Sequence, residues 1–212
     1  MCEARNRGGM KPYYEHNGIA IYHGDCREIL LSLPDGVVIA DPVYPRLDYG
    51  WEFVCPSRLG LRCRQFYFWM NLEPFPLAPS AIHIWAKSNV YVGDAEQFET
   101  IYEVNGKRVC SVMREAAINS TVAAEMSDDV FYGHPCQKPL KLMVRLLKKT
   151  SGIVIDPFMG SGTTLVAAKK LGRKAIGIEI EEKHCEIAAK RLSQEVFDFN
   201  TRTIATVDAD GG

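Results

Sequence analysis

The chain has 212 residues, of which 47% are hydrophobic and 24% charged, and its formal net charge at pH 7 is −1. This length suits one sizeable domain but is too short for two full ones, and the composition is that of an ordinary globular protein. No apolar run approaches the ~20 residues that span a bilayer, and the polar N-terminus lacks the apolar core of a signal peptide, so we expect a cytoplasmic protein without membrane contact.

The cysteines suggest neither a metal site nor a redox motif. None of the seven lies in a Cys-x-x-Cys pair, which is the usual spacing for both. His134 with Cys136 and His184 with Cys185 are near neighbours, but no further ligand completes a set of four. We therefore predict buried free thiols and no metal ion.

The first part of the chain alternates short apolar strands with a helix. Residues 19–22 are predicted to form a strand, residues 24–25 its turn and residues 26–33 a helix. Residues 36–40 are predicted to form a second, fully buried strand. It delivers the segment Asp41-Pro-Val-Tyr44 at its carboxyl end.

The middle of the chain is less regular. Residues 65–70, 81–86 and 98–104 are predicted to be strands, the first of them strongly aromatic. Residues 106–133 have no clean hydrophobic period, so we expect a small irregular insertion there.

The last part has the clearest pattern. A strand over 152–156 is followed by a glycine-rich loop over 157–162 and a helix over 163–171, and then by a strand over 174–179 and a helix over 182–192. We predict a single α/β domain over residues 12–192, with a doubly wound, mostly parallel, Rossmann-like sheet. A polar, acidic tail follows over residues 193–212.

An acidic residue ends or closely follows each of four predicted strands. These residues are Asp25, Asp41, Asp156 and Glu179. Ligands of open α/β sheets bind outside the carboxyl ends of the strands, so four acids in matching positions indicate a site rather than surface decoration.

The glycine-rich loop predicts a nucleotide-like ligand, because Gly160 and Gly162 permit close backbone approach at a helix N-terminus. No lysine follows the glycines, which excludes a P-loop, and the loop lacks the third glycine of a dinucleotide site and has Thr163-Thr164 there. Asp156 would repel a pyrophosphate but attract a cationic amino acid group. Glu179 is placed to accept hydrogen bonds from two ribose hydroxyls. These charges favour S-adenosylmethionine.

Four segments resemble the motifs of amino-methyltransferases that act on DNA. Residues 156–164 resemble the cofactor motif, residues 134–139 the segment before it, residues 22–25 the turn beside the cofactor adenine, and Asp41-Pro-Val-Tyr44 the catalytic DPPY motif. The catalytic motif comes first, as in the permuted β group of these enzymes. The resemblance covers residues 18–47 and 134–192 well and the middle only loosely.

The resemblance implies methyl transfer from S-adenosylmethionine, with S-adenosylhomocysteine as product, to an exocyclic base amine. An acid at position 41 favours N6 of adenine, and N4 of cytosine is the alternative. The resemblance implies that the Asp41 carboxylate and the Pro42 carbonyl accept the amine hydrogens, while Tyr44 stacks on a base that has left the double helix.

The same resemblance assigns the cofactor site. Asp25 would accept from the adenine amine, and Phe158 would cover one face of the cofactor. Lys138 would pair with the cofactor carboxylate or brace the pocket. The remaining residues of the site are Asp156, Pro157, Gly160, Gly162, Thr163, Thr164 and Glu179. For the two threonines, an ordinary helix N-cap is the competing interpretation.

The chain departs from the family pattern at two positions. Val43 stands where a second proline is usual, which loosens the loop and leaves a catalytically impaired, DNA-binding relic as an alternative. Cys136 stands where threonine is usual. Pro135-Cys136 also resembles the nucleophile of cytosine C5 methyltransferases, but there the cofactor motif precedes the cysteine.

The expected partner is double-stranded DNA. Candidate DNA-facing residues are Arg46, Arg58, Arg62, Arg64 and Lys107, together with the basic run from Lys138 to Lys149. The short target-recognition segment leaves room for a second copy of the chain, and a cognate restriction endonuclease is a further candidate partner. RNA or a protein side-chain amide is an alternative methyl acceptor.

Overall fold

The computed structural model describes residues 10–43, 54–69, 73–88, 97–118, 130–133 and 137–193. Its strands are β1 (Tyr14–His16), β2 (Ile19–His23), β3 (Val37–Ala40), β4 (Gln65–Trp69), β5 (Ala81–Lys87), β6 (Phe98–Val104), β7 (Ser111–Glu115), β8 (Val154–Asp156) and β9 (Ala175–Glu179). Its α-helices are α1 (Cys26–Ile29), α3 (Leu140–Leu147), α4 (Thr163–Lys170) and α5 (Glu182–Ser193). Two 3-10 helices, η1 (Leu30–Ser32) and η2 (Pro56–Leu59), complete the described elements. None of the helices in these ranges is long and apolar enough to cross a bilayer.

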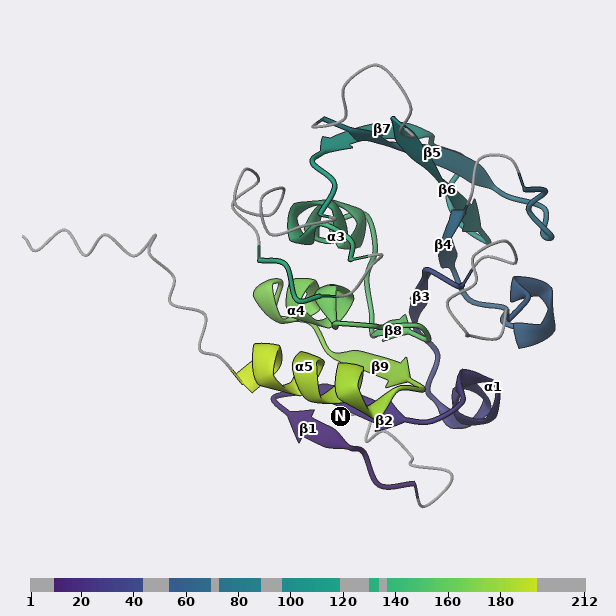
Figure 1. Cartoon of the computed structure of the whole chain (residues 1–212). Coiled ribbons are helices and arrows are strands. Elements are labelled where there is room, and N and C mark those ends of the chain that lie inside the picture. Colours follow the sequence, from purple (N-terminus) through teal and green to yellow (C-terminus); the bar gives the residue numbers. More distant parts are fainter. Residues whose placement is uncertain are drawn as a thin grey trace, which may run out of the picture.

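The described strands form one sheet in the order β1-β2-β9-β8-β3-β4-β6-β5-β7. Strands β2, β9, β8, β3 and β4 run parallel to one another. Strand β6 lies antiparallel between β4 and β5, and β1 adds an antiparallel edge. Figure 1 shows this sheet as a curved layer from β1 to β7, with α3 and α4 on one side and α1 on the other.

The two faces of the sheet bury separate cores because neighbouring strand residues point to opposite sides. In β3, Val37 and Ile39 join the core under α3, α4 and α5, while Val38 and Ala40 join the core under α1. A strand that is buried on both faces needs a continuous apolar run, which is what residues 37–40 supply. The α/β, mostly parallel fold predicted from the sequence is confirmed.

Several local boundaries differ from the predicted ones. The predicted helix over 26–33 has only four α-helical residues, because η1 tightens the chain before it turns into β3. The stretch over 106–133 contains one regular element among its described residues, β7, which pairs parallel with β5. The hydrophobic pattern of β7 is weak because its two apolar neighbours differ in burial: Met113 is buried and Val112 is exposed, as expected at the edge of a sheet.

The described cysteines are free, but they are not all buried. Cys26 and Cys185 lie in the two cores, and burial raises the pKa of their thiols to about 11 and about 12. Cys110 is exposed, so the prediction of buried thiols was wrong there. It directly precedes the edge strand β7.

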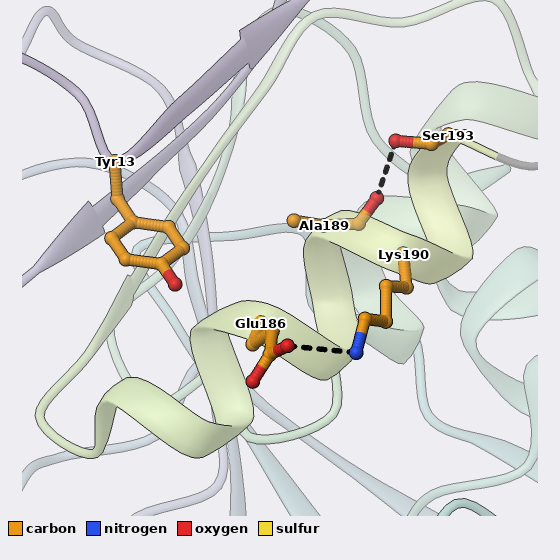
Figure 2. A pocket seen from close by; sticks show the side chains of 5 residues that line it. All are labelled: Tyr13, Glu186, Ala189, Lys190 and Ser193. Atoms are coloured by element: carbon orange, nitrogen blue, oxygen red, sulfur yellow. Dashed lines mark hydrogen bonds and ion pairs between the residues drawn. The ribbon is translucent and has the colours of Figure 1, made fainter.

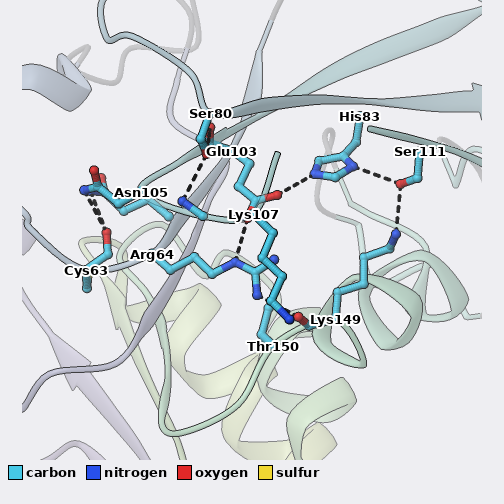
Figure 3. A network of polar contacts seen from close by, with 12 residues as sticks. Cys63, Arg64, Ser80, His83, Glu103, Asn105, Lys107, Ser111, Lys149 and Thr150 are labelled. Carbon is cyan, nitrogen blue, oxygen red and sulfur yellow. Dashed lines mark hydrogen bonds and ion pairs between the residues drawn. The ribbon is translucent and has the colours of Figure 1, made fainter. Parts of the chain in front are cut away.

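A buried polar network closes the end of the sheet away from the strand-end acids. Glu103 of β6 accepts from Arg64 Nε at 2.7 Å and contacts His83 Nε2 at 2.9 Å, as Figure 3 shows. His83 Nδ1 lies 2.9 Å from Ser111 Oγ, which also accepts from Lys149 Nζ at 3.0 Å. The network ties β4, β5, β6 and β7 to the end of α3. Arg64 is thus occupied within the fold, which contradicts its placement among DNA-facing residues.

Replacing Glu103 by Gln is expected to lower the free energy of unfolding by about 3 kcal/mol, because the change removes a buried carboxylate and leaves the partly buried Arg64 without its counter-charge. The Glu103 side chain is 1% exposed, and that of Arg64 is 23% exposed. Urea denaturation followed by circular dichroism measures the change. The control is Glu186→Gln, which removes an exposed ion pair with Lys190 and should leave the midpoint nearly unchanged. Equal midpoints for both variants would contradict the role assigned to Glu103.

Candidate active site

The four strand-end acids lie along one edge of the sheet. Strands β2, β9, β8 and β3 are consecutive neighbours and parallel, so their carboxyl ends meet at the same edge. β2 and β9 pair up to Glu179, Asp156 pairs with Gly177 of β9, and Asp41 follows β3 directly. The predicted juxtaposition of Asp25, Asp41, Asp156 and Glu179 is confirmed, while their ligand roles stay predictions.

The glycine-rich loop turns sharply between β8 and α4. Gly160 and Gly162 have φ values of 49° and 80°, a region that side chains disfavour. A Cβ atom on Gly162 would also lie 2.7 Å from Ala188 Cβ of α5. The loop therefore needs glycine at position 162 both for its turn and for helix packing. Pro157 is buried under the loop, and Phe158 is half-buried against the α1-side core.

Neither threonine after the loop caps the helix, so the interpretation of these residues as N-caps was wrong. The N-cap residue of α4 is Gly162, and no side chain at that position bonds to the first turn. Thr163 and Thr164 are both buried at the start of the helix. Thr164 hydrogen-bonds Asp156, and Thr163 Oγ1 accepts from Arg191 Nη1 at 3.2 Å. Their hydroxyls hold the loop together from inside.

Glu179 also holds the loop. Its Oε2 accepts from Gly160 N at 2.9 Å, and its Oε1 accepts from Glu181 N at 2.8 Å. Each carboxylate oxygen has two lone pairs, so these bonds leave acceptor capacity on both atoms. Glu179 can therefore position the loop and still accept from a ligand hydroxyl.

Asp156 is buried at the mouth of the loop. Its Oδ1 accepts from Phe158 N at 3.0 Å. Burial raises the pKa of its carboxyl to about 7, and the nearby Asp41 and Glu179 add to this, while the hydrogen bonds from Thr164 and Phe158 oppose it. A carboxylate in this setting is costly to ionise alone, so a cationic ligand would be stabilised beside it.

Asp25 caps the short helix α1 and is held by a neighbouring cation. Arg27 N donates to Asp25 Oδ1 at 2.8 Å, and Arg27 Nε donates to Asp25 Oδ2 at 2.9 Å. The Arg27 side-chain hydrogen bonds hold the pKa of this carboxyl below its usual range. Asp25 stays ionised, and an adenine amine would have to share it with Arg27.

Asp41 stands directly after β3, with its side chain 19% exposed. Pro42 is buried and Val43 is half-buried. Tyr44, the third predicted catalytic residue, lies outside the described residues, as do His134, Pro135, Cys136 and Arg46. The structure thus positions the carboxylate and the carbonyl that were predicted to hold an amine.

Lys138 connects this acid to the far half of the sheet. Its Nζ lies 2.7 Å from Asp41 Oδ2 and 3.4 Å from Glu99 Oε2 of β6. Between its two predicted roles, this contact favours bracing the pocket, and pairing with a cofactor carboxylate stays a prediction. Sequence reasoning missed Glu99, because a single acid in an amphipathic strand is usually solvated.

Arg191 is a second residue that sequence reasoning missed. It is buried near the end of α5 and donates from Nη1 to Ser161 O at 2.6 Å, directly beneath the glycine-rich loop. The Tyr132 ring lies 4.0 Å from its guanidinium carbon, and Tyr132 N donates to Gln137 Oε1 at 2.9 Å. Arg191 thereby joins the loop to the segment around Gln137. A lone arginine in a polar helix carries no sequence signal for such a role.

The basic run does not form one continuous cationic face. Lys138 faces Asp41, Arg145 Nε lies 2.9 Å from Glu115 Oε1, and Lys149 bonds Ser111. Lys141 and Lys148 are exposed. The run therefore contributes less free positive charge than its sequence indicates.

A shallow surface pocket lies elsewhere, between the entry to β1 and the outer face of α5. Figure 2 shows its lining by Tyr13, Glu186, Ala189, Lys190 and Ser193, with Lys190 Nζ 2.7 Å from Glu186 Oε1. It includes none of the strand-end acids. In the described part of the chain no cluster of His, Cys, Asp and Glu could hold a metal ion, and the absence of a metal stays a prediction.

The geometry divides into two chemical parts. Asp156, Glu179 and the glycine-rich loop offer carboxylates and close backbone approach, which suits a cationic ligand that carries hydroxyls and disfavours a polyphosphate. Asp41 and Pro42 offer two hydrogen-bond acceptors next to the place of that ligand, which suits an amine with two N–H groups. Such an arrangement can hold an amine beside a cationic ligand that donates a chemical group.

Comparison with known proteins agrees with this division. A family model described as DNA methylase, N6_N4_Mtase, matches residues 76–190. The Type II methyltransferase M.ScaI of Streptomyces caespitosus is 26% identical over 257 residues, which covers 87% of this chain and 84% of that protein. The Type II methyltransferase M2.DpnII of Streptococcus pneumoniae is 49% identical over 65 residues, which covers 29% of this chain and 24% of that protein.

Two solved structures share the fold. The M1.HpyAVI–SAM complex superimposes with a TM-score of 0.55 at 24% identity, over 82% of this chain and 99% of that one. The PvuII DNA methyltransferase, described as cytosine-N4-specific, gives a TM-score of 0.62 at 16% identity, over 89% of this chain and 91% of that one.

Proposed function

The chain belongs to the N6/N4 DNA methylase family, and from this premise we propose that it transfers a methyl group from S-adenosylmethionine to N6 of adenine in double-stranded DNA. The observation that carries the proposal is the arrangement of Asp41 beside Asp156 and Glu179 on adjacent strand ends. N4 of cytosine is the second candidate, because the structural relative from PvuII is described as cytosine-N4-specific.

The donor set fits S-adenosylmethionine. The buried Asp156 suits the cationic amino acid group, and Glu179 has lone pairs for ribose hydroxyls. Gly160 and Gly162 allow the ligand close to the backbone, and Pro157, Thr163 and Thr164 shape the loop beneath it. We expect Asp25 to accept from the adenine amine and Phe158 to cover one face of the cofactor. When bound, this cofactor supplies an electrophilic methyl group on a positively charged sulfur.

The residues of the chain contribute mainly by positioning the amine. An exocyclic amine conjugated to its ring is a weak nucleophile, since its lone pair is delocalised. The Asp41 carboxylate and the Pro42 carbonyl accept hydrogen bonds from its two N–H groups, which favours a more tetrahedral nitrogen and directs its lone pair away from the ring. When the nitrogen gains the methyl group it must lose one proton, which the Asp41 carboxylate would accept. Tyr44 stacks on a base that has been flipped out of the helix. Holding both reactants in line supplies the greater part of the rate enhancement.

The acid at position 41 favours adenine, and Val43 leaves the two acceptors in place. Loss of the second proline ring at position 43 is therefore not enough by itself to make the chain a catalytically impaired relic.

Membership of an N6/N4 family argues against the cytosine C5 alternative built on Cys136. A DNA substrate also supports a cytoplasmic location. A second copy of the chain and a cognate restriction endonuclease complete the proposed partners, the latter because relatives are named Type II methyltransferases.

The test identifies the methylated base directly. The purified chain is incubated with S-adenosylmethionine and unmethylated DNA, and the digested nucleosides are analysed by mass spectrometry. We expect N6-methyladenine, with unchanged yield in Cys136→Ala. N4-methylcytosine would favour the second candidate, and 5-methylcytosine that disappears in Cys136→Ala would restore the C5 alternative. Cofactor binding without any methylated base would contradict the proposed reaction and favour either the impaired relic or an acceptor other than DNA.

A further inference from the structure

A chain of four alternating charges runs from β5, the strand next to the edge strand β7, to Asp41. Lys87 Nζ of β5 lies 3.1 Å from Glu99 Oε1 of β6, and Glu99 Oε2 lies 3.4 Å from Lys138 Nζ. Lys138 Nζ in turn lies 2.7 Å from Asp41 Oδ2. We name these four residues the charge chain. They come from four separate segments, and the folded sheet brings them together.

The charge chain is largely shielded from water. The side chains of Lys87, Glu99, Lys138 and Asp41 are 13%, 17%, 10% and 19% exposed. Lys138 Nζ lies 5.0 Å from the centre of the Phe68 ring, which stabilises its positive charge. Charges in such a setting are weakly screened, so each one influences the others more than on an open surface.

Glu99 is a buried acid to which the proposed amine chemistry assigns no role. Burial alone would raise the pKa of its carboxyl, but Lys138 and Lys87 outweigh it and hold the pKa below its ordinary value. Its Oε2 atom is buried and accepts no hydrogen bond from the described residues, although Lys138 lies within ion-pair distance. Glu99 is therefore an anion that attracts Lys138 in competition with Asp41.

We propose that Glu99 is a positioning residue, which shares Lys138 with Asp41 and so keeps the Asp41 carboxylate available to the target amine. This inference rests on the proposed function. With Glu99 in place, Lys138 steadies Asp41 without neutralising it fully. Without Glu99, Lys138 would interact more strongly with Asp41 and weaken it as an acceptor.

The proposal predicts the sign of each change in the pKa of Asp41. Among the described residues, the charged groups around Asp41 are Lys138 before α3 and Asp156 on β8, with Glu99 and Lys87 behind Lys138. Glu99→Gln removes a negative charge, so it should lower the pKa of Asp41. Lys138→Gln and Lys87→Gln remove positive charges and should raise it, Lys87→Gln by less because it is farther away.

The experiment measures that titration without any need for activity. The protein is labelled with 13C at the aspartate carboxyl carbon, the Asp41 signal is identified by its loss in Asp41→Asn, and its titration midpoint is followed by NMR. We expect a rise of about one pH unit in Lys138→Gln, a smaller rise in Lys87→Gln and a fall in Glu99→Gln. Lys138→Arg keeps the charge and should stay near wild type. The matched control is Glu115→Gln, which changes a shielded carboxylate on β7 outside the charge chain. It should leave the titration midpoint of Asp41 unchanged.

A second readout links the charge chain to the reaction. At saturating DNA and cofactor, Glu99→Gln should lower the single-turnover methylation rate by about tenfold, as expected for one weakened hydrogen bond, and leave cofactor affinity unchanged. An unshifted Asp41 titration in a folded Glu99→Gln protein, or a shift in the same direction as in Lys138→Gln, would overturn the proposal. An inactive wild type with the predicted shifts would instead contradict the proposed function and leave the coupling standing.

Discussion

Replacing Asp41 by Asn is expected to lower the single-turnover rate of methyl transfer by about a thousandfold, the usual order for removing a key charged acceptor from a preorganised site. Asparagine keeps the shape of the side chain but has one acceptor oxygen, no charge and an amide that would face the target amine. The lost charge also releases Lys138 to Glu99. The measurement is transfer of labelled methyl groups to DNA under single-turnover conditions, with cofactor affinity followed by calorimetry.

The expected pattern separates catalysis from folding. Cofactor affinity should change by only a few-fold, because the proposed cofactor-binding residues Asp156 and Glu179 lie on other strands. Asp35→Asn is the matched control, since Asp35 precedes the same strand and is exposed. If the Asp41→Asn protein retained a tenth of the wild-type rate, Asp41 would not have the catalytic role proposed for it.

Replacing Asp156 by Asn should change stability and cofactor binding in opposite directions. The pKa of this carboxyl is about 7 in the folded chain, against an ordinary value of 3.8, chiefly because it is buried. At pH values between these two pKa values, the Asp156 carboxyl keeps its proton in the folded state but has released it in the unfolded state. Its contribution to stability is therefore full below about pH 4 and is lost as the pH rises through about 7, a change on the order of 4 kcal/mol.

Asparagine at this position would carry no charge, so Asp156→Asn should raise the free energy of unfolding at about pH 8 by a few kcal/mol, with little gain at about pH 4. Urea denaturation at the two pH values measures this. Cofactor affinity at the higher pH should fall at least about tenfold, because the cationic group loses its counter-charge. In the wild type, affinity should weaken as the pH drops below the pKa of about 7. A variant that lost stability at the higher pH would show that partners hold Asp156 in its ionised form and would contradict this account.

The position of most site residues could be predicted because it depends on local patterns. Residues 37–40 and 152–156 have the apolar runs of buried strands, and each run ends in or is followed by an acid, so the carboxyl edge could be located before any pairing was known. The glycine-rich loop before α4 was predictable for the same reason. Its two left-handed residues are glycines, the residue type that adopts this conformation without strain.

Contacts between distant segments could not be predicted in this way. No local signal places β6 between β4 and β5, since strand order follows from the packing of the whole sheet. For the same reason, a cofactor carboxylate was one predicted partner of Lys138, whereas the fold sets Lys138 between Asp41 and Glu99. The N-cap assignment for Thr163 and Thr164 also did not hold, because a buried threonine bonds whatever the fold brings near it.

Local sequence patterns were enough to establish the α/β class, the order of the motifs and the edge at which the acids gather, because strand periodicity, turn glycines and strand-end residues act over a few neighbouring positions. How those acids are held depends instead on the packed molecule. Packing joins Lys87, Glu99, Lys138 and Asp41 in one charge chain and sets Arg191 under the glycine-rich loop. These contacts link residues from separate elements, and their strength depends on burial, which arises only when the sheet and its helices pack together.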